Sequence, residues 1–155
     1  MKNKNLENYN FIETEDGSVT AFSKLYGEAC HSTSGAVNET HTHYIKGCDI
    51  LNKSQSKNIS ILEVGLGVGI GFLETSKVLS GSFFTFLTME IDQDLIEYVI
   101  ASNSIFEGMI KKEYFYELKT QSFHLIILNG DARETLPKYR KEFNPKFDCI
   151  YQDAF

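Results

Sequence analysis

The sequence lacks the features of a membrane or secreted protein. Its longest apolar stretch, Phe83–Ile91, is interrupted by threonines and falls well short of the ~20 apolar residues that span a bilayer. The first residues, Met1–Asn10, are polar and rich in asparagine, without the apolar segment of a signal peptide. The three cysteines are widely spaced and include no Cys-x-x-Cys pair, which indicates reduced thiols. We therefore expect a cytoplasmic protein with no membrane span.

Repeats, low-complexity tracts and Pro-rich linkers are also missing, and the composition is that of one globular domain. The 155 residues are 42% hydrophobic, enough to form one buried core. The net charge is 15 − 21 = −6, so the chain as a whole does not have the charge of a typical nucleic-acid binder. Local basic groups do occur, and a solvated helix face is the simpler interpretation of each: Lys138, Arg140, Lys141 and Lys146, and Lys111 with Lys112.

Residues 1–50 have the pattern of a β-hairpin followed by a loop. An Asp16-Gly17 dipeptide, typical of tight hairpin turns, stands between the β-prone runs Phe11–Thr14 and Ser18–Phe22. Residues 27–35 follow as a polar loop that begins and ends with glycine. We predict that this N-terminal extension precedes an incomplete Rossmann-like core over residues 51–155.

From Ile59 onward, predicted strands alternate with predicted helices. Helices are expected over residues 69–79, residues 95–99 with Asp92 or Asp94 as N-cap, residues 106–118, and Ala132–Tyr139, bent at Pro137. The expected strands are Ile59–Val64, Phe83–Met89, His124–Leu128 and Phe147–Tyr151. This alternation predicts an α/β fold with a doubly wound parallel sheet. Because the sequence ends just after the fourth strand, we expect an apolar edge strand and a fragment or truncated product that lacks the C-terminal strands.

Ligands of such sheets bind at the carboxyl ends of the strands, where this sequence has glycines and acidic residues. The first strand is followed by Gly65, Gly67 and Gly69, which would let the backbone approach a ligand closely. A dinucleotide fingerprint is missing, since its third glycine would fall on Ile70 or Phe72. Glu63, two residues before the first of these glycines, instead resembles motif I of S-adenosylmethionine-dependent methyltransferases.

The other strand ends extend this pattern. Glu90 follows the second strand and could accept hydrogen bonds from ribose hydroxyls; a helix N-cap is the alternative, which Asp92 or Asp94 would fill better. Asp131 follows the third strand and could accept from an adenine amino group or cap the next helix. Asp153 follows the fourth strand. The order and spacing of these residues predict a nucleoside-type cofactor.

Two segments resemble the methyltransferase domain of MnmC-type enzymes, which methylate the aminomethyl group on the wobble uridine of certain tRNAs. They are Leu128–Pro137 and Tyr151–Phe155, and residues 16–39 are similar as well, with Cys30 where that family usually has an aromatic residue. The resemblance implies a class I methyltransferase fold, S-adenosylmethionine as cofactor, and tRNA as a partner of the full-length protein. It implies that Asp153 lies next to the methyl group and that the cofactor site comprises Glu63, Gly65, Gly67, Gly69, Glu90, Asp131 and Ala132, with Glu28, His31 and Ser32 as its roof.

The resemblance also suggests how methyl transfer would proceed. A sulfonium makes its methyl group electrophilic, so the protein has mainly to align the attacking amine and exclude water. Because a primary amine is mostly protonated at neutral pH, it must first lose a proton. We hypothesise that Asp153 binds the amine and helps to remove that proton.

Several alternatives stay open. A zinc site could draw on Cys30, His31, His41, His43 and Cys48, but their spacing matches no closed structural site, and His41 and His43 would point to the same side of a strand; we expect no metal. A polyamine aminopropyltransferase would share the hairpin, the glycine turn and the acidic strand ends. A third reading is a non-catalytic, truncated cofactor-binding remnant, or a module that a partner chain completes.

Overall fold

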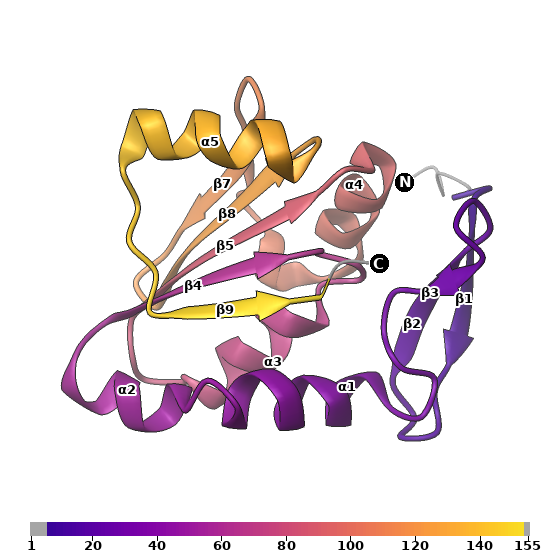
Figure 1. Ribbon diagram of the computed structural model, residues 1–155, viewed down its shortest axis with the longest axis horizontal. Helices are drawn as coiled ribbons and strands as arrows, with labels where there is room; N and C mark the ends of the chain where they lie inside the picture. The colour runs from indigo at the N-terminus through magenta and orange to yellow at the C-terminus, as the bar shows by residue number, and fades with distance from the viewer. Residues whose placement is uncertain (1–5, 154–155) are drawn as a thin grey trace.

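The computed structural model describes residues 6–153, which form a mixed α/β fold with two sheets (Figure 1). A small antiparallel sheet of order β1-β2-β3 contains β1 (Tyr9–Glu13), β2 (Val19–Ser23) and β3 (Glu28–Ala29). The larger, six-stranded sheet has the order β6-β7-β8-β5-β4-β9. Its strands are β4 (Ile59–Val64), β5 (Phe84–Glu90), β6 (Ile110–Lys111), β7 (Phe115–Lys119), β8 (Phe123–Asn129) and β9 (Cys149–Gln152).

Helices connect and cover these strands. The segment before β4 contains α1 (Ala36–Glu39), the π-helix η1 (Thr40–Lys46) and α2 (Ile50–Ser56). The remaining helices are α3 (Ile70–Val78), α4 (Gln93–Ser102), the 3₁₀ helix η2 (Ser104–Phe106) and α5 (Ala132–Phe143). No helix among residues 6–153 is long and apolar enough to cross a membrane.

The four predicted core strands are confirmed as β4, β5, β8 and β9; the bounds of β4 agree, and those of the other three are shifted by one or two residues. They run parallel to one another in the order β8-β5-β4-β9. β4 is paired in register with β5 through Leu62 and Leu87, and with β9 through Glu63 and Tyr151. All four strands therefore present their carboxyl ends at one edge, and β9 is an edge strand, as predicted.

The predicted helix over residues 106–118 is wrong. Gly108 has a φ of +86°, which ends the η2 turn, and the chain then forms β6 and β7. The aromatic residues Phe115 and Tyr116 suit a strand, and β7 pairs antiparallel with β8. Antiparallel pairing follows from the connection between the two strands, since residues 120–122 are too few for the crossover that parallel strands need.

Helices cover both faces of the large sheet. On one face, Phe72 of α3 packs with Ile96 and Val99 of α4 and with strand residues such as Phe86 and Ile127. On the other face, Tyr139 of α5 packs with a second cluster: Leu62, Leu87, Met89, Phe115, Ile126 and Leu128. Figure 1 shows α5 above the sheet and α1, α2 and α3 below it. The near-continuous apolar strands reflect this burial on two faces.

α5 is longer than the predicted Ala132–Tyr139. It continues past Pro137 to Phe143, whose ring packs against Phe115 and Tyr139 at centroid distances of 5.9 and 4.5 Å. Asn144, with a left-handed φ of +46°, ends the helix there. Packing against the sheet thus outweighs the missing backbone donor of the proline.

The expected strand around His41 and His43 is also wrong, because both residues lie in the π-helix η1. The segment of α1, η1 and α2 packs against the face that carries α3, with Ile45 and Ile50 in the core cluster. On the helix, His41 Nε2 contacts Glu74 Oε2 at 3.0 Å, which joins η1 to α3. The contact with the Glu74 carboxylate explains the position of the His41 ring.

The hairpin is confirmed, and it docks at the carboxyl ends of the parallel strands. In Figure 1 the arrows of β4, β5 and β9 point toward the small sheet. The hydroxyl of Tyr9 on β1 donates to Asp92 Oδ2 at 2.9 Å, and the ring of Phe11 stacks on Tyr98 of α4 at 4.6 Å. Asp92 also caps α4, since its Oδ1 accepts from the backbone N–H of Asp94 and Leu95. One carboxylate therefore starts a helix and holds the hairpin over the strand ends.

We predict that Phe72→Ala lowers the free energy of unfolding by about 3–5 kcal/mol, because the ring is fully buried and contacts four other aromatic rings. Chemical denaturation of both variants would measure the loss. Phe143→Ala is the matched control, since that ring is 48% exposed and should cost clearly less. Equal losses for the two variants would contradict the position of Phe72 at the centre of the core.

Candidate functional site

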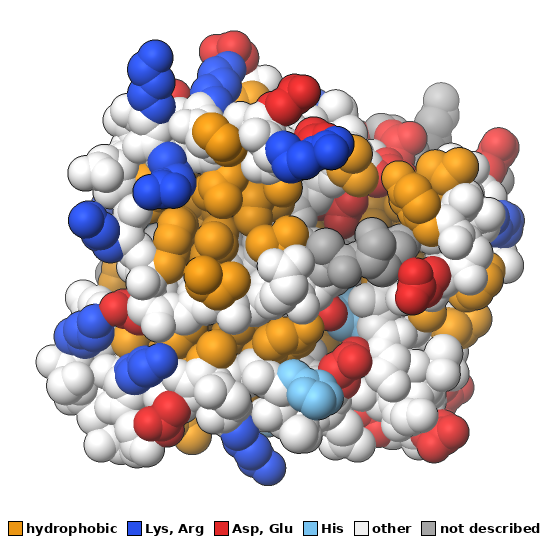
Figure 2. Space-filling view, viewed as in Figure 1, with side chains coloured by type: hydrophobic (Ala, Val, Ile, Leu, Met, Phe, Trp, Pro, Cys, Tyr) orange, Lys and Arg blue, Asp and Glu red, His pale blue; other side chains and the backbone are white. Residues whose placement is uncertain are grey.

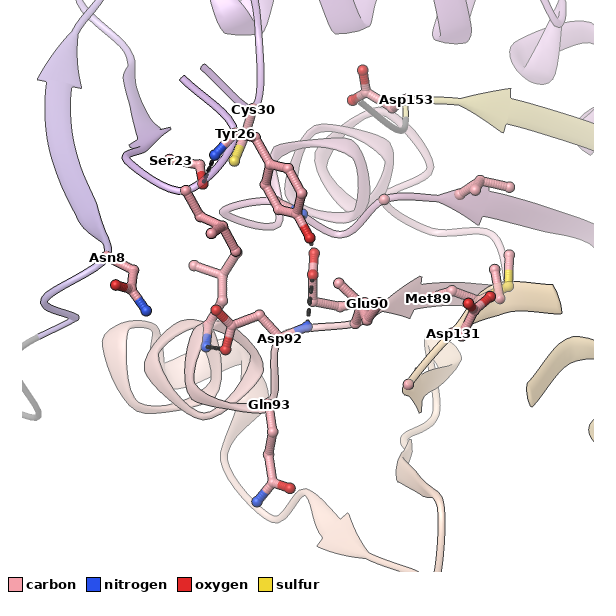
Figure 3. Close-up of a pocket in the computed structure, with 18 of the residues that line it drawn as sticks. Asn8, Ser23, Tyr26, Cys30, Met89, Glu90, Asp92, Gln93, Asp131 and Asp153 are labelled. Carbon is pink, nitrogen blue, oxygen red and sulfur yellow. Dashed lines mark hydrogen bonds between the residues drawn. The ribbon is translucent and has the colours of Figure 1, made fainter. Parts of the chain in front are cut away.

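The carboxyl ends of the parallel strands and the N-terminal hairpin enclose a cavity of about 620 Å³ (Figure 3). From the large sheet and its following turns, the lining residues are Val64, Gly65, Gly67, Met89, Glu90, Ile91, Asp92, Gln93, Leu95, Gly130, Asp131, Ala132, Arg133 and Asp153. From the hairpin side they are Asn8, Tyr9, Ser23, Leu25, Tyr26 and Cys30. Residues from both predicted regions of the chain thus share one cavity, whose volume suits a small organic ligand.

The glycine turn after β4 forms one wall of the cavity. Gly67 has a φ of +53°, and a Cβ atom there would lie 2.8 Å from His31 Cε1 and 3.2 Å from Cys30 Cβ. Only glycine fits this close approach between the turn and the residue 30–31 loop. The turn is held to the neighbouring strand, because the backbone N–H groups of Gly65 and Leu66 both donate to Met89 O.

Glu90 is the last residue of β5, and its side chain faces the same turn. Its Oε2 accepts from the Gly67 N–H at 3.3 Å, and its Oε1 accepts from the Asp92 N–H at 3.0 Å. Burial raises the pKa of this carboxyl, and the two N–H groups oppose that rise. Each carboxylate oxygen can accept a further hydrogen bond, so Glu90 has the capacity to bind a pair of hydroxyl groups.

Asp131 combines the two alternatives that the sequence left open. Its Oδ1 accepts from the Arg133 N–H at 2.8 Å, which caps α5, and its side chain also lines the cavity. The exposed Arg133 guanidinium binds both carboxylate oxygens. These hydrogen bonds lower the pKa of Asp131 to about 2, so the group is a carboxylate at neutral pH.

Asp153 lies where β9 leaves the sheet, and its N–H donates to Val64 O at 2.9 Å. The Tyr44 hydroxyl donates to Asp153 Oδ1 at 3.0 Å, and His31 Nε2 lies 3.4 Å from Oδ2. Burial raises the pKa of Asp153 to about 7 and lowers that of His31 to about 4. The carboxyl at the cavity wall can therefore exchange a proton near neutral pH. Ala154 and Phe155, which complete the predicted motif, lie outside the described residues.

Glu63 does not line the cavity. It is 1% exposed and lies beneath the glycine turn, where its Oε2 accepts from Thr88 Oγ1 at 2.6 Å. Its Oε1 faces Gly71 in the first turn of α3, so closely that a Cβ at Gly71 would lie 1.8 Å away. Burial raises the pKa of Glu63 well above its usual value. In this structure Glu63 supports the turn and the start of α3 from below.

The other predicted site residues differ in position. Ala132 lines the cavity, and His31 lies directly behind the glycine turn, against Gly67 and Asp153. Gly69 is the N-cap of α3 and contacts Val99, away from the lining. Glu28 on β3 is exposed, and the Ser32 N–H donates to Glu39 Oε2; neither residue lines the cavity.

Sequence reasoning missed several cavity residues. Asp92 was expected only as a helix cap, and Tyr9, Tyr26 and Arg133 were given no role. Tyr44, which does not line the cavity but contacts Asp153, was given no role either. Tyr44 is 109 positions from Asp153 in sequence, so no local spacing could connect them. For Arg133, a signal was available: a basic residue two positions after an acidic helix cap can reach back to that cap.

Metal ligands do not gather in the described part of the chain. Within residues 6–153, no group of three or more His, Cys, Asp or Glu side chains could hold a metal ion. Of the histidines considered for zinc, His31 contacts Thr20 and Asp153, and His41 contacts Glu74. Cys30, Cys48 and Cys149 are free thiols.

Comparison with known proteins gives distant relatives. No family model matches the chain. It is 27% identical over 158 residues to the uncharacterized protein MJ0670 of Methanocaldococcus jannaschii, covering 96% of this chain and 42% of that protein. It is 25% identical over 164 residues to the tRNA 5-methylaminomethyl-2-thiouridine biosynthesis bifunctional protein MnmC of Leptospira interrogans, covering 92% of this chain and 25% of that protein.

Among solved structures, the chain is similar to MnmC2 from Aquifex aeolicus. The TM-score is 0.70 at 24% sequence identity, over 95% of this chain and 49% of that chain. The match shows that the two proteins share this mixed α/β fold. With the sequence similarity to MnmC, it supports the resemblance to an MnmC-like domain. The chain spans less than half the length of each of these relatives.

We predict that Glu63→Gln weakens the pH dependence of stability. A carboxyl whose pKa is raised in the folded state keeps a proton that the unfolded chain releases, so its contribution is full at acid pH and is lost as the pH rises. The free energy of unfolding should therefore fall more for the wild type than for the variant as the pH rises from 5 to 8. Denaturant titrations across this range measure the difference, with Glu113→Gln as an exposed control. If the free energy of unfolding changed with pH in the same way for wild type and Glu63→Gln, the raised pKa of the buried Glu63 would be contradicted.

Proposed function

We propose that this chain is an S-adenosylmethionine-dependent methyltransferase that acts on the aminomethyl group of a tRNA wobble uridine. One observation carries the proposal. The carboxyl ends of parallel strands bring a left-handed glycine turn, Glu90, Asp131 and Asp153 around one cavity of about 620 Å³. The fold similarity to MnmC2 and the sequence similarity to MnmC agree with it.

The position of the cavity supports a nucleoside ligand. In open α/β sheets, ligands bind outside the carboxyl ends of the strands, where the strand order reverses. Here β5 and β8 extend to one side of β4, and β9 lies on the other. The reversal therefore falls between β4 and β9, next to the glycine turn and Asp153. We assign the ribose hydroxyls to Glu90 and the adenine amino group to Asp131, and a class I methyltransferase core to the parallel strands.

The charge of the cavity supports a cationic ligand. Four of its lining side chains are acidic, and its basic side chain, Arg133, is already bound to Asp131. The acidic ones are Glu90, Asp92, Asp131 and Asp153. When bound, S-adenosylmethionine supplies an electrophilic methyl group on a positively charged sulfur, which this field would attract.

Asp153 has the properties that proton removal from an ammonium group requires. Its Oδ1 is held by Tyr44, and its pKa of about 7 lies near the working pH. The carboxylate would accept one proton from the substrate ammonium, which frees the nitrogen lone pair for attack on the methyl carbon. The C–S bond then breaks, with its electron pair left on sulfur.

A tRNA would have to bind outside this acidic cavity. On the face shown in Figure 2, Lys and Arg side chains border an apolar surface on its left, upper and lower sides. Ile150 of the edge strand β9 is 59% exposed. We include in the proposal that this cationic border contributes to tRNA binding. A further segment or a partner chain that pairs with β9 would complete the sheet. A cytoplasmic location fits a tRNA substrate.

A polyamine aminopropyltransferase is the second candidate, because the acidic cavity would also suit a polyamine and the decarboxylated form of the cofactor. The same four carboxylates favour it. The two candidates differ in the ligand they prefer. A clear preference for the decarboxylated cofactor in competition binding would favour the aminopropyltransferase.

Calorimetry with S-adenosylmethionine and S-adenosylhomocysteine tests the cofactor. We expect micromolar binding of both. Glu90→Gln should weaken it at least about tenfold, since a hydrogen bond to a charged acceptor is lost. The exposed Glu113→Gln is the control and should bind like wild type. Absence of heat with either compound on folded protein would reject the proposal.

Transfer of a labelled methyl group to tRNA that carries the unmethylated aminomethyl uridine tests the reaction. Asp153→Asn should bind the cofactor within about threefold of wild type and lose at least about 10²-fold in transfer, because a positioned acid–base group typically contributes 10²–10⁴-fold. An unchanged rate in Asp153→Asn would remove the residue from the mechanism. Cofactor binding without transfer in wild type would instead favour a non-catalytic remnant.

A further inference from the structure

Tyr44 reaches the candidate active site from a part of the chain to which sequence analysis gave no role. It lies on η1, a seven-residue π-helix, and π-helical turns occur often at functional sites. Its hydroxyl lies 3.0 Å from Asp153 Oδ1 and 2.9 Å from Gln152 O, so it contacts the end of β9 at two points. The Tyr44 ring stacks on Tyr151 at 4.9 Å with an interplanar angle of 22°. The ring is therefore fixed in place, and its hydroxyl with it.

His31 lies next to the second oxygen of the same carboxyl. Its Nε2 lies 3.4 Å from Asp153 Oδ2, and its Nδ1 lies 3.0 Å from the hydroxyl of Thr20, which is fully buried on β2. A Thr20 hydroxyl that donates to Nδ1 leaves the imidazole proton on Nε2, directed at Asp153. Gly67 makes room for the ring, since a Cβ there would lie 2.8 Å from Cε1.

The surroundings of Asp153 make these two neutral donors important. The charged side chains that act on it are acidic and come from two elements: Glu39 of α1 and Glu63 of β4. Among residues 6–153, no Lys or Arg forms an ion pair with Asp153. Cys30, the nearest thiol on the hairpin side, is held protonated because burial raises its pKa to about 12. The Tyr44 hydroxyl thus stabilises the carboxylate through a hydrogen bond to one oxygen, and His31 Nε2 lies against the other.

We propose that Tyr44 and His31 are positioning residues that clamp the two oxygens of Asp153 and aim the remaining lone pairs into the cavity. The role of this clamp rests on the proposed function, in which Asp153 removes one proton from a substrate ammonium. Its geometry involves segments from β2, η1 and β9, so it forms only when the hairpin is docked on the core. The clamp therefore couples docking of the N-terminal extension to the protonation state of the carboxyl.

An NMR titration of the Asp153 carboxyl carbon in the whole chain tests the clamp without any activity. Loss of a hydrogen bond to the charged form raises a pKa. Tyr44→Phe keeps the ring stack and should raise the titration midpoint by about one pH unit. The matched control is Tyr151→Phe, which removes the hydroxyl of the stacked partner; that hydroxyl contacts Thr75 and not Asp153. It should leave the midpoint unchanged.

Variants of His31 provide a second test of the clamp. His31→Ala should also raise the midpoint, and His31→Gln, whose side-chain amide can donate from near the Nε2 position, should restore most of the wild-type value. In methyl transfer, the acidic limb of the rate profile for Tyr44→Phe should move by the same amount, with cofactor affinity within about threefold of wild type.

An Asp153 midpoint that stays within about 0.2 pH units in Tyr44→Phe, or that moves equally in Tyr151→Phe, overturns the clamp. The proposed function can be rejected independently of the clamp. If the midpoint shifts as expected and no cofactor binds, the clamp stands as a property of the fold and its role in methyl transfer is rejected.

Discussion

Parallel pairing of β4 with β5 on one side and with β9 on the other sets Glu63, Glu90 and Asp153 at one edge of the sheet. The register fixes which atoms meet there, because Gly65 and Leu66 donate to the end of β5 and Asp153 donates to the end of β4. A slip of one residue would turn each of these side chains to the opposite face. The cavity, the glycine turn and the docking of the hairpin all depend on this register.

Gathering carboxyl groups at a partly buried edge is costly, and for three of them the hydrogen bonds within residues 6–153 come from neutral donors. Glu63 has the Thr88 hydroxyl, Glu90 has two backbone N–H groups, and Asp153 has the Tyr44 hydroxyl. Neutral donors of this kind lower the cost of burial but leave the negative potential of the site in place. A cationic ligand would then lower the free energy of the whole group. The negative potential that raises the free energy of the free protein would therefore also make this edge selective for cationic ligands.

The sequence predicted the parts of the fold that local pattern determines. Alternation of apolar runs with helical spacing located β4, β5, β8 and β9, and Asp16-Gly17 located the hairpin. Residues 106–118 were predicted wrongly because β7 is stabilised by its antiparallel pairing with β8, which no local pattern in that segment encodes. The helices before β4 went unpredicted for a similar reason, since α1 and η1 pack on α3, and α2 packs on η1 and β4.

For the candidate site too, residues at strand ends could be predicted from local pattern, and residues from distant segments could not. Gly65, Gly67, Glu90, Asp131, Ala132 and Asp153 follow directly from strand ends, and the structure brings them around the cavity. Glu63 alternates on β4 with Val64, which lines the cavity, so the Glu63 side chain points to the other side of the strand. Gly69 lies beside the cavity as the N-cap of α3. Tyr44, Tyr9 and Tyr26 come from segments far away in sequence, so only the folded chain brings them to the site.

A crystal structure of the chain with S-adenosylhomocysteine would test the assignment of the cofactor site, because it locates each ligand atom against named side chains. We predict that both ribose hydroxyls bind the Glu90 carboxylate, that the adenine lies next to Asp131, and that the sulfur faces Asp153. A ligand bound elsewhere, or in this cavity with its ribose away from Glu90, would contradict it.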